Sequence, residues 1–399
     1  MSDGTSEEVS DPKAEPGAAV TANPGGIAEP AAAEPAAAAG DPGSEPPVDG
    51  RPTQGGSRLR RALLALPRIV AALAATLAVV AVVILIMGAD PFRVAEVVIE
   101  SSTGDPFVLG QTIMIAGILT LTGLAAAIPF RAGLWNVGAE GQLYAGAIAA
   151  AAVALTVSPE MPSTLAVPLV LLGALVGGAV WGLIAGGLKA ALDLNEVIVS
   201  LMLTFIAILA ADYVVRVLWP QGISPQTERI PPNTIAPMIW QEGLVTIAPI
   251  VAVVAAVAGW FLIRHMGMGF QIRAVGFNAR TARASGISSG RVAVWTFVIG
   301  GAVAGLAGGL VVSGVTNSLV SNFSPNYGFL GIAVALIARL EPLWLVPAAF
   351  VFAMLRVGSN GLEVDVGLSS ALGDVLVTIF IISLLFFGLV KLPTARGDL

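Results

Sequence analysis

The sequence predicts an all-α, polytopic membrane protein with about ten transmembrane helices. Hydrophobic residues make up 56% of the 399 residues and charged residues only 12%, whereas soluble domains have about 25% charged residues. A chain this apolar cannot cover itself with polar side chains in water. Cysteine is absent, which excludes disulfides, thiolate metal sites and cysteine nucleophiles. The sequence contains no metal-binding or nucleic-acid-binding pattern, so neither a metal nor another cofactor is predicted.

The first 57 residues differ from the rest of the chain. They hold ten acidic residues but only Lys13 and Arg51 as basic ones, and they are rich in proline, alanine and glycine. Such a segment buries too little apolar surface to offset the entropy lost on ordering. We therefore expect a disordered acidic tail over 1–57 and a transmembrane domain over 58–399.

Apolar runs close to the roughly 20 residues that cross a bilayer recur along the remaining chain. The first run, Ile69–Met87, is free of charge and follows four arginines between residues 58 and 68. The predicted spans centre on 69–87, 107–129, 141–157, 165–188, 196–219, 244–263, 291–315, 328–340, 342–358 and 371–390.

Basic residues predict the orientation, because flanks rich in lysine and arginine stay in the cytoplasm. The arginines before the first span place the N-terminus inside, and an even number of spans returns the C-terminus there. The loop 264–291 then lies on the same side, and it contains five arginines and no acid.

Glycines mark two predicted helix contacts. In one span Gly178, Gly182 and Gly186 repeat at intervals of four, as do Gly301, Gly305 and Gly309 in another. Each set lies on one helix face, and small faces let helices approach closely in lipid. The stretches around them are also similar, which either an internal repeat or convergent small-residue composition explains.

A broken helix is predicted between Pro129 and Gln142, where one proline and three glycines interrupt two apolar runs. Broken helices are tolerated at membrane depth where they line a cavity or are buried in protein. Asn136 and Glu140 share a helix face if this turn is helical. Asn136, Glu140 and Gln142 therefore either line a pathway, or cap the ends of the broken helix or lie in the cytoplasmic headgroup region.

The loop 268–292 predicts a short basic helix. Asn278 is a plausible N-cap, and Gly286 suits the left-handed position that ends a helix. The helix holds Arg280, Ala282, Arg283 and Ala284, and its shape is suited to dock into another protein. The alternative is an ordinary solvated basic loop on the cytoplasmic side.

Four stretches carry a family resemblance: GLWNVGAEGQLYAGAIAA, LNEVIVSLMLTFIA, GFQIRAVGFNARTARASGI followed by GGAVAGLAGGL, and GFLGIAVALIARLEPLWLVPAAFVFAMLRVGSNGLE. Together they resemble the permease subunits of ABC importers for ribose, branched-chain amino acids and nucleosides. The first two stretches are most similar to the nucleoside branch, which works with a basic-membrane-protein lipoprotein as receptor.

The resemblance implies a bacterial plasma-membrane permease, paired with a second permease subunit and with ABC ATPases, that imports a nucleoside delivered by the receptor lipoprotein. It implies that the helix at 277–286 is the coupling helix seated in the ATPase. The sequence has no G-x-x-x-x-G-K-[ST] phosphate-binding loop, so the chain is not predicted to be an enzyme and its partner supplies the ATP site.

Several polar residues are predicted to lie along the pathway. They are Asn136, Glu140, Gln142, Ser200 and Thr204, with Asn317, Asn322, Asn326 and Tyr327 as further candidates that an ordinary outer loop explains equally well. A sugar permease is the alternative within the family. An ion-coupled carrier or an intramembrane enzyme is a different alternative, but beyond Glu140 and Asp212 the spans offer few groups for it.

Overall fold

The computed structural model describes residues 74–362 and 370–386. All of them belong to one compact unit, Arg58–Leu399. The predicted acidic tail, the arginines of the basic flank and the first five residues of the first predicted span lie outside the described residues.

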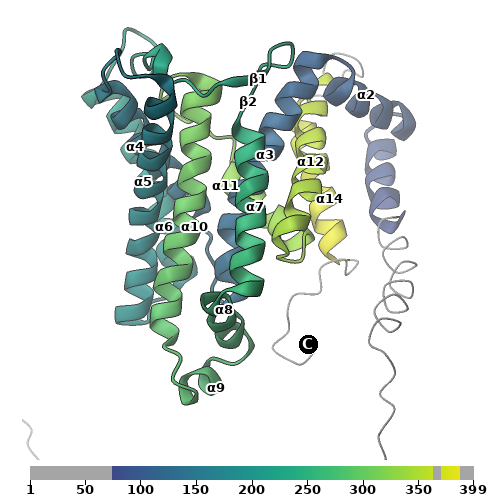
Figure 1. The fold of residues 1–399 in the computed structure, drawn as a ribbon. Coiled ribbons are helices and arrows are strands. Elements are labelled where there is room, and N and C mark those ends of the chain that lie inside the picture. Colours follow the sequence, from purple (N-terminus) through teal and green to yellow (C-terminus); the bar gives the residue numbers. More distant parts are fainter. Residues whose placement is uncertain (1–73, 363–369, 387–399) are drawn as a thin grey trace, which may run out of the picture. The chain divides into compact units, whose positions relative to one another are not determined.

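The described residues are mainly helical (Figure 1). A short hairpin of β1 (Met238–Trp240) and β2 (Val245–Thr246), paired antiparallel, departs from the all-α prediction. Helix α6 continues as the π-helical turn η1 (Val214–Leu218), and α10 continues as η3 (Val312–Thr316). A 3-10 turn, η2, covers Pro232–Thr234. The helices are Ala74–Ile86, α2 (Pro91–Thr103), α3 (Pro106–Arg131), α4 (Ala139–Thr156), α5 (Ser163–Leu192), α6 (Glu196–Tyr213), α7 (Ala248–His265), α8 (Gly267–Phe277), α9 (Ala279–Ala284), α10 (Ser289–Val311), α11 (Tyr327–Ile337), α12 (Pro342–Gly358) and α14 (Ser370–Phe386).

The prediction of a polytopic membrane protein is confirmed, but the count of about ten spans is not. Among the described residues, five helices are long and apolar enough to cross a membrane, and a sixth span results if the bent pair Ala74–Ile86 and Pro91–Thr103 counts as one. That pair bends by 106°. Helices α11, α12 and α14 are 11, 17 and 17 residues long, below the roughly 20 that a crossing needs.

Helix starts follow local sequence signals. Asp90 and Asp105 each precede a proline, and each carboxylate accepts a hydrogen bond from the backbone N–H two residues on, at 2.9 and 2.8 Å. Proline suits the first helical position because its missing N–H has no partner there anyway. Asn195 caps α6 in the same way, at 2.9 Å from the Val197 N–H. The sequence did not lead us to expect α2, which lies between two predicted spans.

Helix α3 forms the centre of the bundle. Its span is 89% buried, whereas the spans of α5, α6 and α7 are each 28% buried. The outer helices therefore expose large apolar side chains, such as Leu172, Phe205 and Val254, which suits contact with lipid. Helix α3 is apolar on all sides because every side meets another helix.

The two glycine faces pack directly on each other, so the predicted close approach of helices is confirmed. A Cβ on Gly178 of α5 would lie 2.6 Å from the Gly305 Cα of α10. Farther along the same contact, a Cβ on Gly186 would lie 2.9 Å from the Phe297 Cβ. No side chain larger than hydrogen fits between these backbones without a shift.

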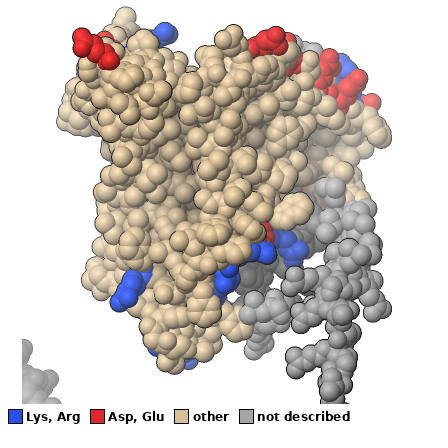
Figure 2. All heavy atoms as spheres, viewed as in Figure 1, with Lys and Arg blue, Asp and Glu red and all other residues tan. Residues whose placement is uncertain are grey.

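The two ends of the bundle differ in charge (Figure 2). Lysine and arginine gather at the end that carries α8 and α9, which we term the basic end. Aspartate and glutamate gather at the opposite end, over α2 and the β1–β2 hairpin, which we term the acidic end.

Candidate functional site

The chain is non-helical between α3 and α4, over residues 132–138, where the sequence predicted a break. The Asn136 side-chain N–H donates to the Ala125 carbonyl at 3.3 Å. Ala125 lies six residues before the end of α3, which is about 9 Å along the helix. The inner segment, as we term 132–138, therefore turns back into the bundle, and α4 begins inside it.

Asn136 and Gln142 form a reciprocal amide pair that closes this break. Each side-chain amide donates to the carbonyl oxygen of the other, at 3.0 and 3.2 Å. The Gly138 backbone N–H also donates to the Asn136 oxygen at 3.1 Å. Both side chains are at most 1% exposed, so the pair satisfies buried polar groups that would otherwise be costly.

A second break precedes α11. Residues 317–326, which we term the outer segment, are non-helical, and Asn317, Asn322 and Asn326 all take positive φ. Asparagine tolerates this backbone region better than most residues. The Thr122 hydroxyl donates to the Tyr327 carbonyl at 3.1 Å, and Thr122 lies about 14 Å from the end of α3. Helix α11 therefore also begins inside the bundle.

Glu140 joins the starts of these two helices. It lies in the first turn of α4, and its carboxylate accepts a hydrogen bond from the Gly328 backbone N–H in the first turn of α11. The Ser324 side chain also bonds to it. Glu140 is 1% exposed. A carboxylate is favourable here because the starts of both helices carry partial positive charge.

The close approach at this junction requires glycine. A Cβ on Gly328 would lie 2.5 Å from the Glu140 Cα. On the other side of α4, a Cβ on Gly141 would lie 2.6 Å from the Thr204 Cα of α6, and one on Gly138 would lie 2.9 Å from the Ser200 Cβ. The start of α4 is thus in close contact with the first half of α6 on one side and with the start of α11 on the other.

The structure brings the five predicted pathway residues together at one place. Ser200 and Thr204 are at most 1% exposed, and their hydroxyls donate to carbonyls of their own helix at 3.3 and 3.0 Å. All five side chains are buried within this single chain. Direct contact between any of them and a cargo stays a prediction.

Of the further candidates, Tyr327 starts α11 beside Glu140, and Asn322 is exposed on the outer segment. Ser324 and Gly328, which bind Glu140, were not among the predicted residues. Gly328 is 188 residues away from Glu140, and no local pattern connects the two positions.

The predicted short helix is present at the basic end as α9. The Asn278 oxygen accepts from the Arg280 and Thr281 backbone N–H groups at 3.0 and 3.1 Å, and Gly286 has a φ of +83°. Both helix-end signals are confirmed. Ala282, however, is 4% exposed within the chain's own core. It anchors α9 on the bundle and is not available for docking as we expected, whereas Arg280, Arg283 and Ala284 are exposed.

An ion cluster at the basic end was not predicted. The Arg131 guanidinium lies 2.7 Å from the Glu341 carboxylate, and Arg264 lies 3.4 Å from it. Burial opposes the charged form of Glu341, but the hydrogen bond from Arg131 and the charges of both arginines outweigh it and hold its pKa below the usual value. The cluster links the ends of α3 and α7 to the start of α12.

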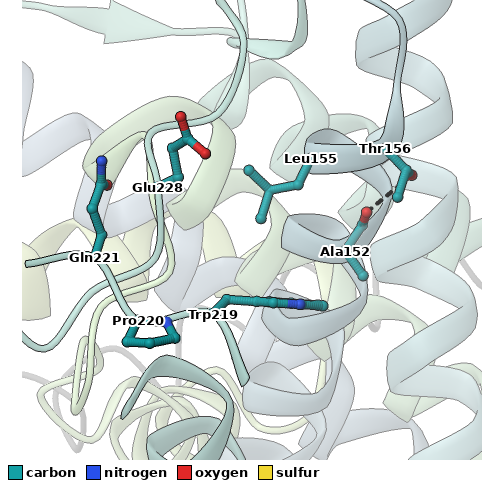
Figure 3. A pocket seen from close by; sticks show the side chains of 7 residues that line it. All are labelled: Ala152, Leu155, Thr156, Trp219, Pro220, Gln221 and Glu228. Atoms are coloured by element: carbon teal, nitrogen blue, oxygen red, sulfur yellow. Dashed lines mark hydrogen bonds between the residues drawn. The ribbon is translucent and has the colours of Figure 1, made fainter. Parts of the chain in front are cut away.

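The acidic end contains a cavity of about 500 Å³ between the last turns of α4 and the chain that follows η1 (Figure 3). It contains none of the predicted pathway residues. Its lining is Ala152, Leu155, Thr156, Trp219, Pro220, Gln221 and Glu228.

Comparison with known proteins now decides the family. Residues 108–385 match the family described as the permease component of branched-chain amino acid transport systems. The chain belongs to this permease family. The matched range includes both breaks, the Glu140 junction and α9.

Individual relatives are similar to the permease over most of their length. A glucose ABC transporter permease of Haloferax volcanii is 35% identical over 78% of this chain and 86% of its own. A nucleoside ABC transporter permease of Lactococcus lactis is 32% identical over 79% and 90%. A guanosine ABC transporter permease of Bacillus subtilis is 34% identical over 70% and 81%.

Proposed function

We propose that the permease is the membrane subunit of an ATP-driven ABC importer and forms the pathway for a nucleoside. The nucleoside and guanosine permeases of two bacteria support this cargo, since both are at least 32% identical to the permease over most of the chain. The glucose permease of Haloferax volcanii favours a sugar as the second candidate.

The observation that carries the choice of an uncharged cargo is the charge of the buried core. Among the described residues, Glu140 is the one charged side chain that is buried, and its carboxylate already binds the Gly328 N–H. An amino acid would bring an ammonium and a carboxylate, and charges inside a membrane protein need partners. A nucleoside or a sugar is uncharged and therefore needs no charged partners in the core.

Energy is proposed to come from ABC ATPase subunits at the basic end. This end is assigned to the cytoplasm because basic flanks stay inside, and both chain termini are proposed to lie on the same side. The exposed residues of α9, Arg280, Arg283 and Ala284, are the proposed ATPase contacts, with Asn278 and Gly286 shaping the helix ends. A substrate-binding lipoprotein at the acidic end and a second permease subunit, identical or paralogous, complete the proposed complex.

Uptake into vesicles tests the proposal. The permease is reconstituted with its ATPase, second permease and receptor, and uptake of labelled guanosine, uridine, ribose and glucose is measured with and without ATP. We expect ATP-dependent uptake of a nucleoside. Uptake of glucose alone would support the sugar alternative, and uptake driven by an ion gradient without ATP would overturn the assignment to ABC importers.

A further inference from the structure

The inner segment is in backbone contact with the element that leads to α9. Gly276, in the last turn of α8, lies against the Arg131 carbonyl, and a Cβ at this position would overlap that oxygen. Gly133, two residues beyond Arg131, takes a φ of +75° and faces Gly276. A shift of α8 and α9 therefore displaces the end of α3 and the inner segment, because no flexible side chain lies between them to absorb it.

The outer segment is tied in turn to the surface of the acidic end. Its backbone pairs with the stretch 225–230 through three hydrogen bonds of 2.9 Å, from Thr227 N–H to Leu319 O, from Ile230 N–H to Asn317 O and from Ser321 N–H to Pro225 O. This stretch belongs to the same connection that lines the cavity in Figure 3.

Glu140 is a side-chain link between the two non-helical segments. Its backbone follows the inner segment by two residues, and its carboxylate binds the first turn of α11, which follows the outer segment. A buried carboxylate is costly inside a membrane protein unless it is fully bound. Its partners, the Gly328 N–H and the Ser324 side chain, both lie on the side of the outer segment.

We propose that Glu140 is a positioning residue that transmits movement of the inner segment to the outer segment, so that the ATPase side controls access at the acidic end. The inference rests on the proposed function, because it assigns the driving movement to an ATPase docked at α9. In this role Glu140 links the movements of the two segments and does not need to contact the cargo.

Two variants of Glu140 with side chains of similar shape distinguish the effect of losing the hydrogen bond from the effect of changing the side-chain volume. Glu140→Gln keeps an oxygen that accepts from the Gly328 N–H, whereas Glu140→Met fills the same space without an acceptor. Thr120→Ala is the matched control, since it removes a buried hydroxyl that bonds only within α3, to the Ala116 carbonyl at 2.8 Å. All three are assayed in the complete reconstituted complex.

Access at the outer segment is measured directly by labelling. The chain has no cysteine, so Ser321→Cys introduces a single, half-buried thiol on the outer segment. Ser163→Cys, at the exposed start of α5, provides a reference thiol on the same side. The rate of reaction with a membrane-impermeant maleimide is compared with and without ATP and vanadate.

We expect ATP and vanadate to change the labelling rate of Ser321→Cys when position 140 is the native Glu140. The same change is expected when Ser321→Cys is combined with Thr120→Ala or with Glu140→Gln. In Glu140→Met the response should fall by at least about tenfold, the effect of losing a hydrogen bond to a charged group. Ser163→Cys should not respond in any background. A full response of Ser321→Cys in Glu140→Met would overturn the inference.

The labelling response does not depend on the identity of the cargo. Failure of nucleoside uptake by the wild-type complex would count against the proposed function, whereas the labelling result decides the role of Glu140. A change of KM for the cargo in Glu140→Met, with the ATP-dependent labelling intact, would show cargo contact and overturn the mechanical role.

Discussion

Replacing Gly178 by alanine should separate α5 from α10. The new Cβ would lie 2.6 Å from the Gly305 Cα, whereas nonbonded carbons rest about 3.5 to 4.0 Å apart, so the helices would have to move apart by roughly 1 Å. The obstacle is backbone, which cannot rotate away as a side chain can. Overpacking of this kind costs about 1 to 3 kcal/mol, and we expect the upper part of that range.

Gly187→Ala is the matched control, because Gly187 lies on the same helix with nothing within 4 Å of its added Cβ. Both variants gain the same helix propensity, about 1 kcal/mol, so their difference isolates the helix contact. In membranes this contact matters more than in water, since lipid supplies no hydrophobic force between helices.

Equilibrium unfolding of the purified protein in mixed micelles measures the difference. Gly178→Ala should unfold at a lower fraction of denaturing detergent than Gly187→Ala, with a gap of about 2 to 3 kcal/mol. Equal midpoints for the two variants would refute the argument that backbone contact between α5 and α10 holds the bundle together.

Four other perturbations have defined outcomes. Gly286→Val should reduce receptor-stimulated ATP hydrolysis while the permease stays in the membrane. The reason is that a β-branched residue is strained at the positive φ of position 286. Unchanged stimulation would contradict the coupling role of α9. Glu341 has a lowered pKa, so its stabilising effect is present above its unfolded pKa and is lost as the pH falls through its lowered folded pKa. Glu341→Gln should remove that acid-dependent loss of thermal stability, and an unaltered pH profile would disprove the link. Gln226 and Val320 face each other in an antiparallel bridge, and residues paired in this way are close enough for a disulfide. The variant with cysteine at both positions should therefore crosslink under oxidation. Recovery of two free thiols would contradict the pairing. Deleting residues 2–50 should leave insertion and uptake near normal, and loss of more than about half of uptake at equal expression would contradict a dispensable tail.

Features that depend on one stretch of sequence were predictable. The break before α4 follows from Pro129 and its neighbouring glycines, and both ends of α9 follow from Asn278 and Gly286. The glycine repeats of α5 and α10 predicted close contact, although not that they contact each other. In each case the physical cause acts over a few residues, through backbone freedom or a side-chain cap.

Features that depend on distant residues were not predictable. Glu140 was singled out as a polar residue in an apolar run, but its partner Gly328 lies in a different part of the chain. The count of about ten spans is not confirmed among the described residues, because hydropathy does not distinguish a crossing helix from a short apolar one such as α11. Ala282 was expected at a docking surface, since composition does not show which side of a short helix faces the core.

The distance along the chain between Glu140 and Gly328 also has a consequence for synthesis. Ribosomes add about 5 to 20 residues per second, so the 188 residues that separate them take about 10 to 40 s to make. During that interval α4 has left the ribosome while the helix that binds its carboxylate does not yet exist. The Thr120 hydroxyl of α3 needs no such wait, since it bonds within its own helix. A nascent chain therefore carries the Glu140 acid in the membrane without its Gly328 partner until the last fifth of the chain is made, and a chain that stalls before α11 never supplies that partner.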